Sequence, residues 1–176
     1  MDSQEFLSRL KKIRIVLMDL DGVLTDGRVV YGDYGDELKF YDIQDGMGID
    51  LLRKGGILTA IISGRKSRVN TRRAKELKIS AVFQGVPDKL KIFTKLLKKY
   101  GVAPEEVCCI GDDLVDVPLM RRAGFAAAVQ NAVPEVKRSA HYVTTKPGGR
   151  GAVREIADEI LKAQGKWDAV TREFFS

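Results

Sequence analysis

Short hydrophobic runs alternate along the chain with segments of helical periodicity. The runs cover residues 13–18, 57–62, 81–83, 107–110, 125–129 and 142–143. They are apolar on both faces, and the segments between them are long enough for a helix, a pattern typical of buried parallel strands. The sequence therefore predicts a doubly wound α/β fold, in which helices cover both faces of a parallel sheet. A last helix is expected from about Gly151 to Ala163.

Residues 28–41 depart from this alternation. Two strand-like runs, 29–31 and 37–41, flank the turn sequence Gly32-Asp33-Tyr34-Gly35, which predicts a β-hairpin. Because the hairpin follows the first strand, we expect it to lie over that strand's carboxyl end as a lid or an oligomer contact. No large cap domain is expected. The aromatic-rich tail, residues 164–176, is expected to dock on its own domain or on a neighbouring subunit.

Composition narrows the class of protein. With 176 residues, 44% of them hydrophobic, the chain is expected to form a single domain over residues 1–176. It has neither an apolar run of the roughly 18 residues of a membrane span nor a signal peptide, so a cytoplasmic protein without membrane contact is expected. The net charge of +6 is scattered rather than gathered with aromatics, which disfavours nucleic-acid binding. Cys108, Cys109 and the single histidine, His141, are interpreted as structural.

Residues suited to phosphate chemistry follow the predicted strands. Asp19 and Asp21 follow the first strand, Ser63 the second, and Asp112, Asp113 and Asp116 the fourth, with Lys89 at the start of a helix. The carboxyl ends of parallel strands share one edge, where ligands bind. A single aspartate there is commonly only a helix cap. The whole ordered set instead predicts a shared cation site, because several neighbouring carboxylates are costly to desolvate without one.

This set of residue types suits phosphoryl transfer. A carboxylate can attack phosphorus and carry the phosphoryl group until water hydrolyses it. A hard cation must relieve the repulsion between the two anions, and Mg²⁺ fits oxygen ligands. A second acid can protonate the leaving alkoxide and then deprotonate water, while Ser63 and Lys89 hold phosphoryl oxygens.

The four motifs resemble those of haloacid dehalogenase phosphatases. Asp19-Leu20-Asp21-Gly22-Val23-Leu24-Thr25-Asp26 is similar to the first motif, and Ser63, Lys89 and Gly111-Asp112-Asp113 with Asp116 are similar to the other three. The resemblance implies that Asp19 is the nucleophile and a metal ligand, and that Asp21 is the acid/base and lends its backbone carbonyl to the metal. It implies Asp112 as the remaining ligand, Asp116 and Asp113 in support, and Ser63 and Lys89 as catalytic phosphoryl-binding residues.

From about Ile13 to Leu161 the chain resembles a narrower family, the 3-deoxy-D-manno-octulosonate 8-phosphate phosphatases, which form tetramers. The shared segments are 25–27, the hairpin, 42–49, 63–65 and 148–155. The resemblance implies a sugar acid phosphate as substrate, an eight-carbon product that serves lipopolysaccharide synthesis, and a homotetramer. The implied substrate-binding residues are Asp42, Ile43, Gln44, Asp45, Gly46, Arg65, Arg73 and Lys89. Arginine forks suit the substrate carboxylate.

Two positions depart from the family pattern. Asp50 stands where a basic residue is expected and Gln44 where an arginine is common, and both changes remove positive charge near the expected substrate site. Hydrolysis of a nine-carbon keto-sugar acid 9-phosphate therefore stays open as an alternative. A non-catalytic assembly module is the alternative of another class.

Overall fold

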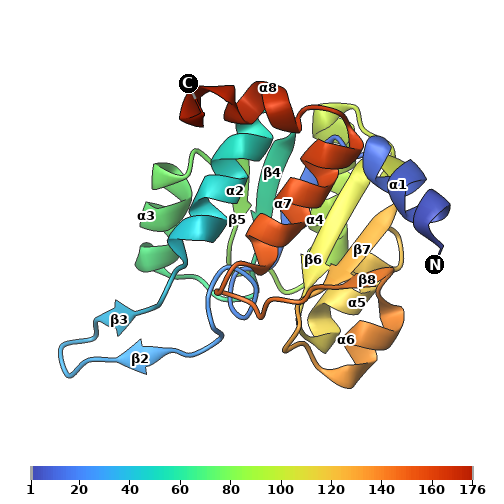
Figure 1. Ribbon diagram of the computed structural model, residues 1–176. Helices are drawn as coiled ribbons and strands as arrows, with labels where there is room; N and C mark the ends of the chain where they lie inside the picture. The colour runs from blue at the N-terminus through green and yellow to red at the C-terminus, as the bar shows by residue number, and fades with distance from the viewer. Residues whose placement is uncertain (1, 176) are drawn as a thin grey trace.

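The computed structural model describes residues 2–175, which contain a parallel six-stranded sheet between two layers of helices (Figure 1). The strands of this sheet are β1 (Ile15–Met18), β4 (Leu58–Ile62), β5 (Ala81–Phe83), β6 (Val107–Gly111), β7 (Phe125–Ala128) and β8 (Tyr142–Val143). Their order is β5-β4-β1-β6-β7-β8, and every neighbouring pair is parallel. The α/β fold predicted from the sequence is confirmed.

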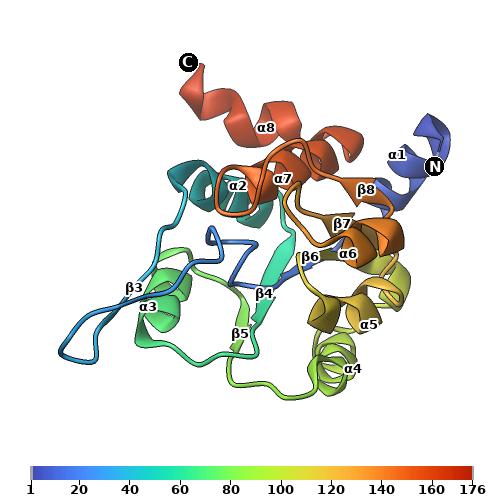
Figure 2. The same ribbon diagram turned by 90° about the horizontal axis from the view of Figure 1, so that it is seen from below.

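The helices lie on both faces of the sheet, with α1, α2 and α7 on one and α4 and α5 on the other (Figures 1 and 2). The α-helices are α1 (Ser3–Lys11), α2 (Ile43–Lys54), α3 (Arg68–Glu76), α4 (Lys89–Tyr100), α5 (Val117–Met120), α6 (Pro134–Ser139), α7 (Ala152–Ala163) and α8 (Trp167–Thr171). Short 3-10 turns cover Pro104–Glu106, Leu114–Asp116 and Arg172–Phe174. None of the helices within residues 2–175 has both the length and the apolar character that a membrane span needs.

The sheet is buried because both of its faces are covered. Every residue of β1, β6 and β7 is buried, which explains why these runs are continuously apolar rather than alternating. Burying each large aliphatic or aromatic side chain contributes about 1.5–3 kcal/mol, so these strands anchor the domain. The residues that follow the strands consequently start from a rigid edge.

The insertion after β1 is the predicted hairpin, built from the antiparallel strands β2 (Val30–Tyr31) and β3 (Glu37–Leu38). It projects from the body of the protein at the edge where the parallel strands end (Figure 1). A backbone bridge between Thr25 and Tyr41 closes its base. No larger cap interrupts the described residues.

The turn before α7 packs directly on the loop after β1. Gly149 N donates to Val23 O over 2.8 Å, and a Cβ at Gly148 would come within 1.7 Å of the Gly22 carbonyl oxygen. A Cβ at Gly149, whose φ is +64°, would lie 2.3 Å from the backbone of Thr25. Two backbones therefore touch here without side chains between them, and this contact holds the loop that follows β1.

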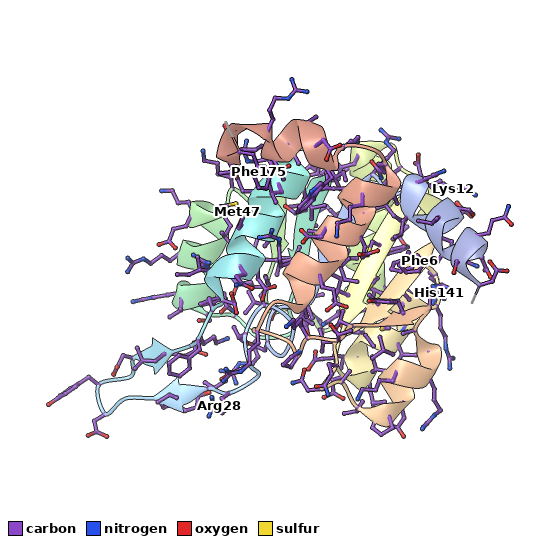
Figure 3. All side chains as sticks on the ribbon, viewed as in Figure 1. Phe6, Lys12, Arg28, Met47, His141 and Phe175 are labelled. Carbon is purple, nitrogen blue, oxygen red and sulfur yellow. The ribbon has the colours of Figure 1, made fainter. Side chains whose placement is uncertain are left out.

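The C-terminal residues dock on their own chain. Val170 and Thr171 of α8 are buried, and the Trp167 ring lies between Arg154 and Lys162, with its centroid 5.9 and 5.3 Å from their cationic groups. Lys54 of α2 forms an ion pair with Glu173. Docking on the same domain was one of the two expectations for the tail. Phe175, labelled beside α2 in Figure 3, is largely exposed.

Candidate active site

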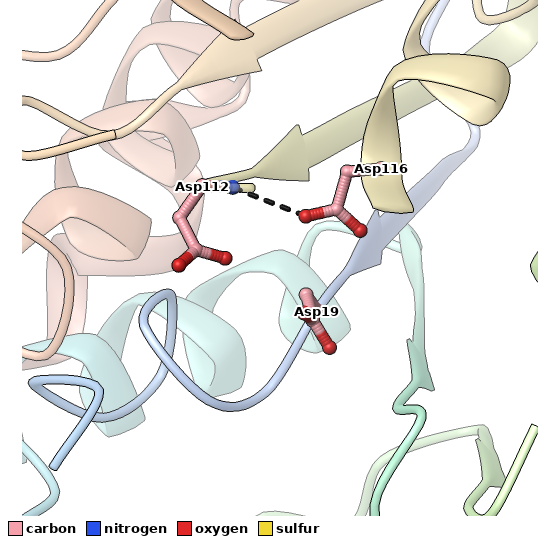
Figure 4. A group of neighbouring side chains, drawn as sticks. All are labelled: Asp19, Asp112 and Asp116. Atoms are coloured by element: carbon pink, nitrogen blue, oxygen red, sulfur yellow. Dashed lines mark hydrogen bonds between the residues drawn. The ribbon is translucent and has the colours of Figure 1, made fainter. Parts of the chain in front are cut away.

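Two neighbouring strands, β1 and β6, bring three aspartates together at the carboxyl edge of the sheet. The chain leaves β1 toward β4 on one side and later returns to β6 on the other, so this is the topological switch point at which such folds bind ligands. Asp19 N donates to Ile110 O over 3.2 Å and extends the sheet pairing into the site. Carboxylate oxygens of Asp19, Asp112 and Asp116 lie within 4.8 Å of one another (Figure 4).

Lys89 lies between two of these carboxylates. Its Nζ is 3.0 Å from Asp19 Oδ2 and 2.8 Å from Asp116 Oδ1, and the lysine is only 7% exposed. Although burial opposes its charge, the carboxylates of Asp116 and Asp19 hold the pKa of Lys89 above its usual value. Lys89 is therefore a charged ammonium that fixes the orientation of Asp19 and Asp116.

Asp116 has hydrogen-bond partners on both of its oxygens. Oδ1 accepts from Lys89, and Oδ2 accepts from the backbone N–H of Asp112 over 3.1 Å (Figure 4). A Cβ at Gly111 would lie 2.5 Å from Asp116 Cβ, so the close approach of this side chain to β6 requires glycine. Asp116 thus braces the turn after β6 and has little free capacity to ligate a cation.

Asp112 differs, because its Oδ1 is buried and has no hydrogen-bond partner. Burial, then the neighbouring carboxylates of Asp116 and Asp19, raise the pKa of Asp112 to about 7. Burial and Asp116 likewise raise the pKa of Asp19 to about 6, against the opposing effect of Lys89. Both carboxyl groups are costly to ionise as they stand, and a cation between them would remove that cost.

Gly22 provides the space that Asp112 occupies. Its φ is +93°, and a Cβ there would lie 2.0 Å from Asp112 Oδ2. The turn after Asp21 is thereby brought against the turn after β6 without a side chain between them. Asp19, Asp112 and the backbone of the first motif form one oxygen-rich cradle, which suits a hard divalent cation.

Asp21 lies beside the cradle and has a partner that the sequence interpretation missed. Lys39 Nζ pairs with Asp21 Oδ1 and lies 3.4 Å from Glu37 Oε1. A signal for it existed: residues two apart on a strand share a face, so Glu37 and Lys39 lie opposite Leu38. The sequence did not show that this polar face turns toward Asp21.

Ser63 and Asp113, both predicted to belong to the site, have different surroundings. Ser63 follows β4, is 1% exposed and accepts from Arg65 N over 3.3 Å. Asp113 is exposed, and its Oδ1 accepts from Leu114 N over 2.7 Å, so it caps the turn Leu114–Asp116. Of the two, only Ser63 is buried at the edge of the sheet.

The two predicted substrate arginines contact different segments. Arg65 Nη2 donates to Tyr31 Oη over 2.9 Å and to Glu37 Oε1 over 3.1 Å, and Nε lies 3.6 Å from Asp21 Oδ2. Arg73 donates to Asp42 O over 3.4 Å and lies over the Tyr41 ring at 5.6 Å. Arg65 therefore belongs to the hairpin side of the site, and Arg73 to the start of α2.

The predicted substrate-binding residues at the start of α2 differ in burial and in their contacts. Asp42 caps the helix through Gln44 N, Ile43 is 83% exposed, and Gly46 leaves room for Arg73, whose Nη2 would lie 2.8 Å from a Cβ. Asp45 is 1% exposed and accepts from the backbone N–H groups of Gly151 and Arg154.

Burial raises the pKa of Asp45 to about 6 against those two hydrogen bonds. Asp45 thus joins α2 to the start of α7 and is not one of the three clustered aspartates. Gln44 lines a hollow together with Lys146 and Arg154, and the acidic residues Glu155, Asp158 and Glu159 line it as well. Arg154 pairs with Asp158 at 2.7 Å, so its charge is already compensated.

Comparison with known proteins places this geometry in a family. Residues 82–156 match the model of the haloacid dehalogenase-like hydrolases. The chain is 43% identical over 166 residues to the 3-deoxy-D-manno-octulosonate 8-phosphate phosphatase KdsC of Escherichia coli K12, covering 94% of this chain and 88% of the relative. It is equally similar, over 169 residues, to the same phosphatase of Yersinia pestis.

Solved structures agree. The Moraxella catarrhalis 3-deoxy-D-manno-octulosonate 8-phosphate phosphatase, in complex with a magnesium ion, a phosphate ion and a KDO molecule, superposes with a TM-score of 0.95 at 43% identity, covering 98% of this chain and 99% of that one. The cobalt-bound Haemophilus influenzae phosphatase superposes with a TM-score of 0.89 at 39% identity, covering 95% and 98%. This chain belongs to the 3-deoxy-D-manno-octulosonate 8-phosphate phosphatase family of haloacid dehalogenase-like hydrolases.

Proposed function

We propose that this protein is a Mg²⁺-dependent phosphatase that hydrolyses 3-deoxy-D-manno-octulosonate 8-phosphate through a phosphorylated Asp19. The strongest support is the combination of two neighbouring carboxylates. Asp19 is held by Lys89, and the buried Oδ1 of Asp112 has no hydrogen-bond partner. The relatives that carry this activity in their names match nearly the whole chain.

The cation would be held by Asp19, Asp112 and the backbone carbonyl of Asp21. Asp116 supports these ligands rather than joining them, because its two oxygens already accept from Lys89 and from the Asp112 N–H. Bound Mg²⁺ would offset the repulsion between the Asp19 carboxylate and the incoming phosphate dianion.

Asp19 and Asp21 divide the chemistry of two successive displacements. An Asp19 oxygen attacks phosphorus, the bond from phosphorus to the sugar oxygen breaks, and Asp21 gives its proton to that leaving oxygen. Asp21 then takes a proton from a water molecule that attacks phosphorus, so the bond to Asp19 breaks and inorganic phosphate leaves. Lys89 and Ser63 bind the transferring oxygens, and Lys89 also keeps Asp19 aimed.

The eight-carbon substrate is favoured over the nine-carbon one because one of the two sequence departures lies apart from the site. Asp50 pairs with Arg53 at 2.5 Å and with Lys54 at 3.5 Å, so its own helix neutralises it. Gln44 borders Lys146, which can supply the missing positive charge, whereas Arg154 already pairs with Asp158 at 2.7 Å. Arg65 and Arg73 are the proposed carboxylate-binding groups.

We also propose a homotetrameric, cytoplasmic enzyme. The hairpin and the start of α2 expose many large apolar side chains, namely Val30, Tyr31, Tyr34, Leu38, Phe40, Ile43 and Met47. Clustered exposed apolar groups of this kind mark interaction surfaces. Cys108 and Cys109 are free and buried, as suits a reducing compartment.

Light scattering at micromolar concentration is expected to give four times the chain mass, because the apolar hairpin needs a partner surface. Replacing the fully exposed Tyr34 and the neighbouring Leu38 by serine is expected to weaken that assembly. A parent protein that stays monomeric at these concentrations would contradict the tetramer.

Mg²⁺ is expected to stabilise the fold through Asp112. At a concentration 100 times its dissociation constant it should raise the free energy of unfolding by about 2.7 kcal/mol. Asp112→Asn is expected to abolish this increase while leaving the metal-free stability at or above that of the parent, because it removes one of three crowded carboxylates. Urea unfolding with and without Mg²⁺ measures both effects.

Asp113→Asn is the matched control, because the Asp113 carboxylate is next in sequence to Asp112 but is exposed and caps a turn. It should keep the Mg²⁺-dependent increase. An increase that persists in the Asp112 variant and disappears in the Asp113 variant would contradict the assigned ligands.

Phosphate release with Mg²⁺ should be faster from the eight-carbon keto-sugar acid 8-phosphate than from the nine-carbon 9-phosphate or from hexose phosphates. Arg65→Ala should raise KM for the preferred substrate by about 10- to 100-fold, the loss expected for a charged hydrogen bond of about 1.5–3 kcal/mol. Preference for the nine-carbon substrate would assign the alternative activity. Absence of turnover on every substrate would favour a non-catalytic assembly module.

A further inference from the structure

Lys39 is a buried cation outside the four phosphatase motifs. Its side chain has no exposed surface, although Leu38 and Phe40 on either side of it are 58% and 62% exposed. Exposure alternates along residues 38–40 just beyond β3, so Lys39 points opposite to its two apolar neighbours. The hairpin therefore turns an ammonium inward at the point where it passes Asp21.

Hairpin stability alone does not account for this lysine. A buried ammonium requires partners, and an isolated hairpin gains more from an apolar or solvated side chain at such a position. The partners of Lys39 are the carboxylates of Asp21 and Glu37. Glu37 in turn pairs with Arg65 at 3.1 Å. The inward side chains of Glu37 and Lys39 are thus linked to the acid/base aspartate by ion pairs.

The two oxygens of Asp21 have different surroundings. Oδ1 accepts from Lys39, whereas Oδ2 is buried and has no hydrogen-bond partner. The cation paired with Oδ2 is Arg65, whose Nε lies 3.6 Å away, beyond hydrogen-bonding distance. One oxygen is therefore held by Lys39, whereas the other accepts no hydrogen bond.

We propose that Lys39 is a positioning residue that holds Asp21 through Oδ1, so that Oδ2 carries the proton to and from the reacting oxygens. This inference rests on the proposed phosphatase function and adds the hairpin to the catalytic arrangement. As Asp21 gives its proton to the sugar oxygen, the carboxylate that forms is already paired with an ammonium. Lys39 therefore acts on the step in which the alkoxide leaves.

A leaving-group comparison tests this proposal. A sugar alkoxide needs a proton to leave, whereas p-nitrophenolate leaves without one. Lys39→Met is expected to lower the single-turnover rate at which the sugar acid phosphate phosphorylates Asp19 about 100-fold, the loss associated with a misplaced catalytic group. With p-nitrophenyl phosphate, the rate of the initial burst of p-nitrophenolate, which reports the same first displacement, should change less than about threefold. The later attack of water also uses Asp21 and is slowed equally for both substrates. Lys39→Arg should restore part of the lost activity.

A double-mutant cycle shows whether Lys39 acts through Asp21. In the Asp21→Asn background, Lys39→Met should lower kcat on the sugar acid phosphate less than about twofold further, because the group it positions is already gone. The double variant has no unpaired Lys39–Asp21 charge, so it stays informative if Lys39→Met alone folds poorly. Thermal unfolding of each variant shows directly whether it folds.

Arg28→Met is the control, because it removes one positive charge from the same hairpin without touching Asp21. Arg28 is exposed and pairs with Asp26 at 2.6 Å (Figure 3). It should leave the ratio of the two first-displacement rates unchanged.

Equal losses in the rate of the first displacement on both substrates in Lys39→Met, or full additivity with Asp21→Asn, would overturn the role of Lys39 while the parent stays active. A parent that hydrolyses neither substrate would overturn the proposed function, and this inference with it.

Discussion

The ion pairs of Lys89 with Asp19 and Asp116 hold the site together. Two carboxylates at the edge of a buried sheet repel each other, and a charged ammonium between them makes their burial tolerable. Removing one partner from such an arrangement typically costs about 3–5 kcal/mol, because the remaining charge is left buried. The orientation of Asp19 and the position of Asp116 at the turn after β6 therefore both depend on Lys89.

Close backbone packing brings the other groups within reach of this pair. Glycine at positions 22 and 111 lets the carboxylates of Asp112 and Asp116 approach the loops to within distances that any Cβ would block. Gly148 also packs on the first-motif loop, against the Gly22 carbonyl. Loops that are held by contacts of this kind keep the oxygen cradle in shape before a cation arrives, which is the preorganisation that phosphoryl transfer needs.

The sequence predicted the sheet, the hairpin and the strand-end positions of the acidic residues, because local periodicity and strand polarity determine them. It did not predict the partners of Lys39 or the hydrogen bond from Gly151 to Asp45. Tertiary packing sets both, and Asp45 and Gly151 are 106 residues apart in the chain. The sequence did not show either that Arg65, before α3, contacts the hairpin, or that Arg73, within α3, contacts the residue that precedes α2.

Trapping the phosphorylated enzyme tests the central claim most directly. A single turnover of phosphorus-labelled sugar acid phosphate, quenched in acid within milliseconds and mapped by mass spectrometry, should place the label on the peptide that contains Asp19. The same peptide from an Asp19→Asn variant should carry none. Label on another residue, or hydrolysis by the parent without any labelled peptide at any quench time, would contradict the account of Asp19 as the group that carries the phosphoryl.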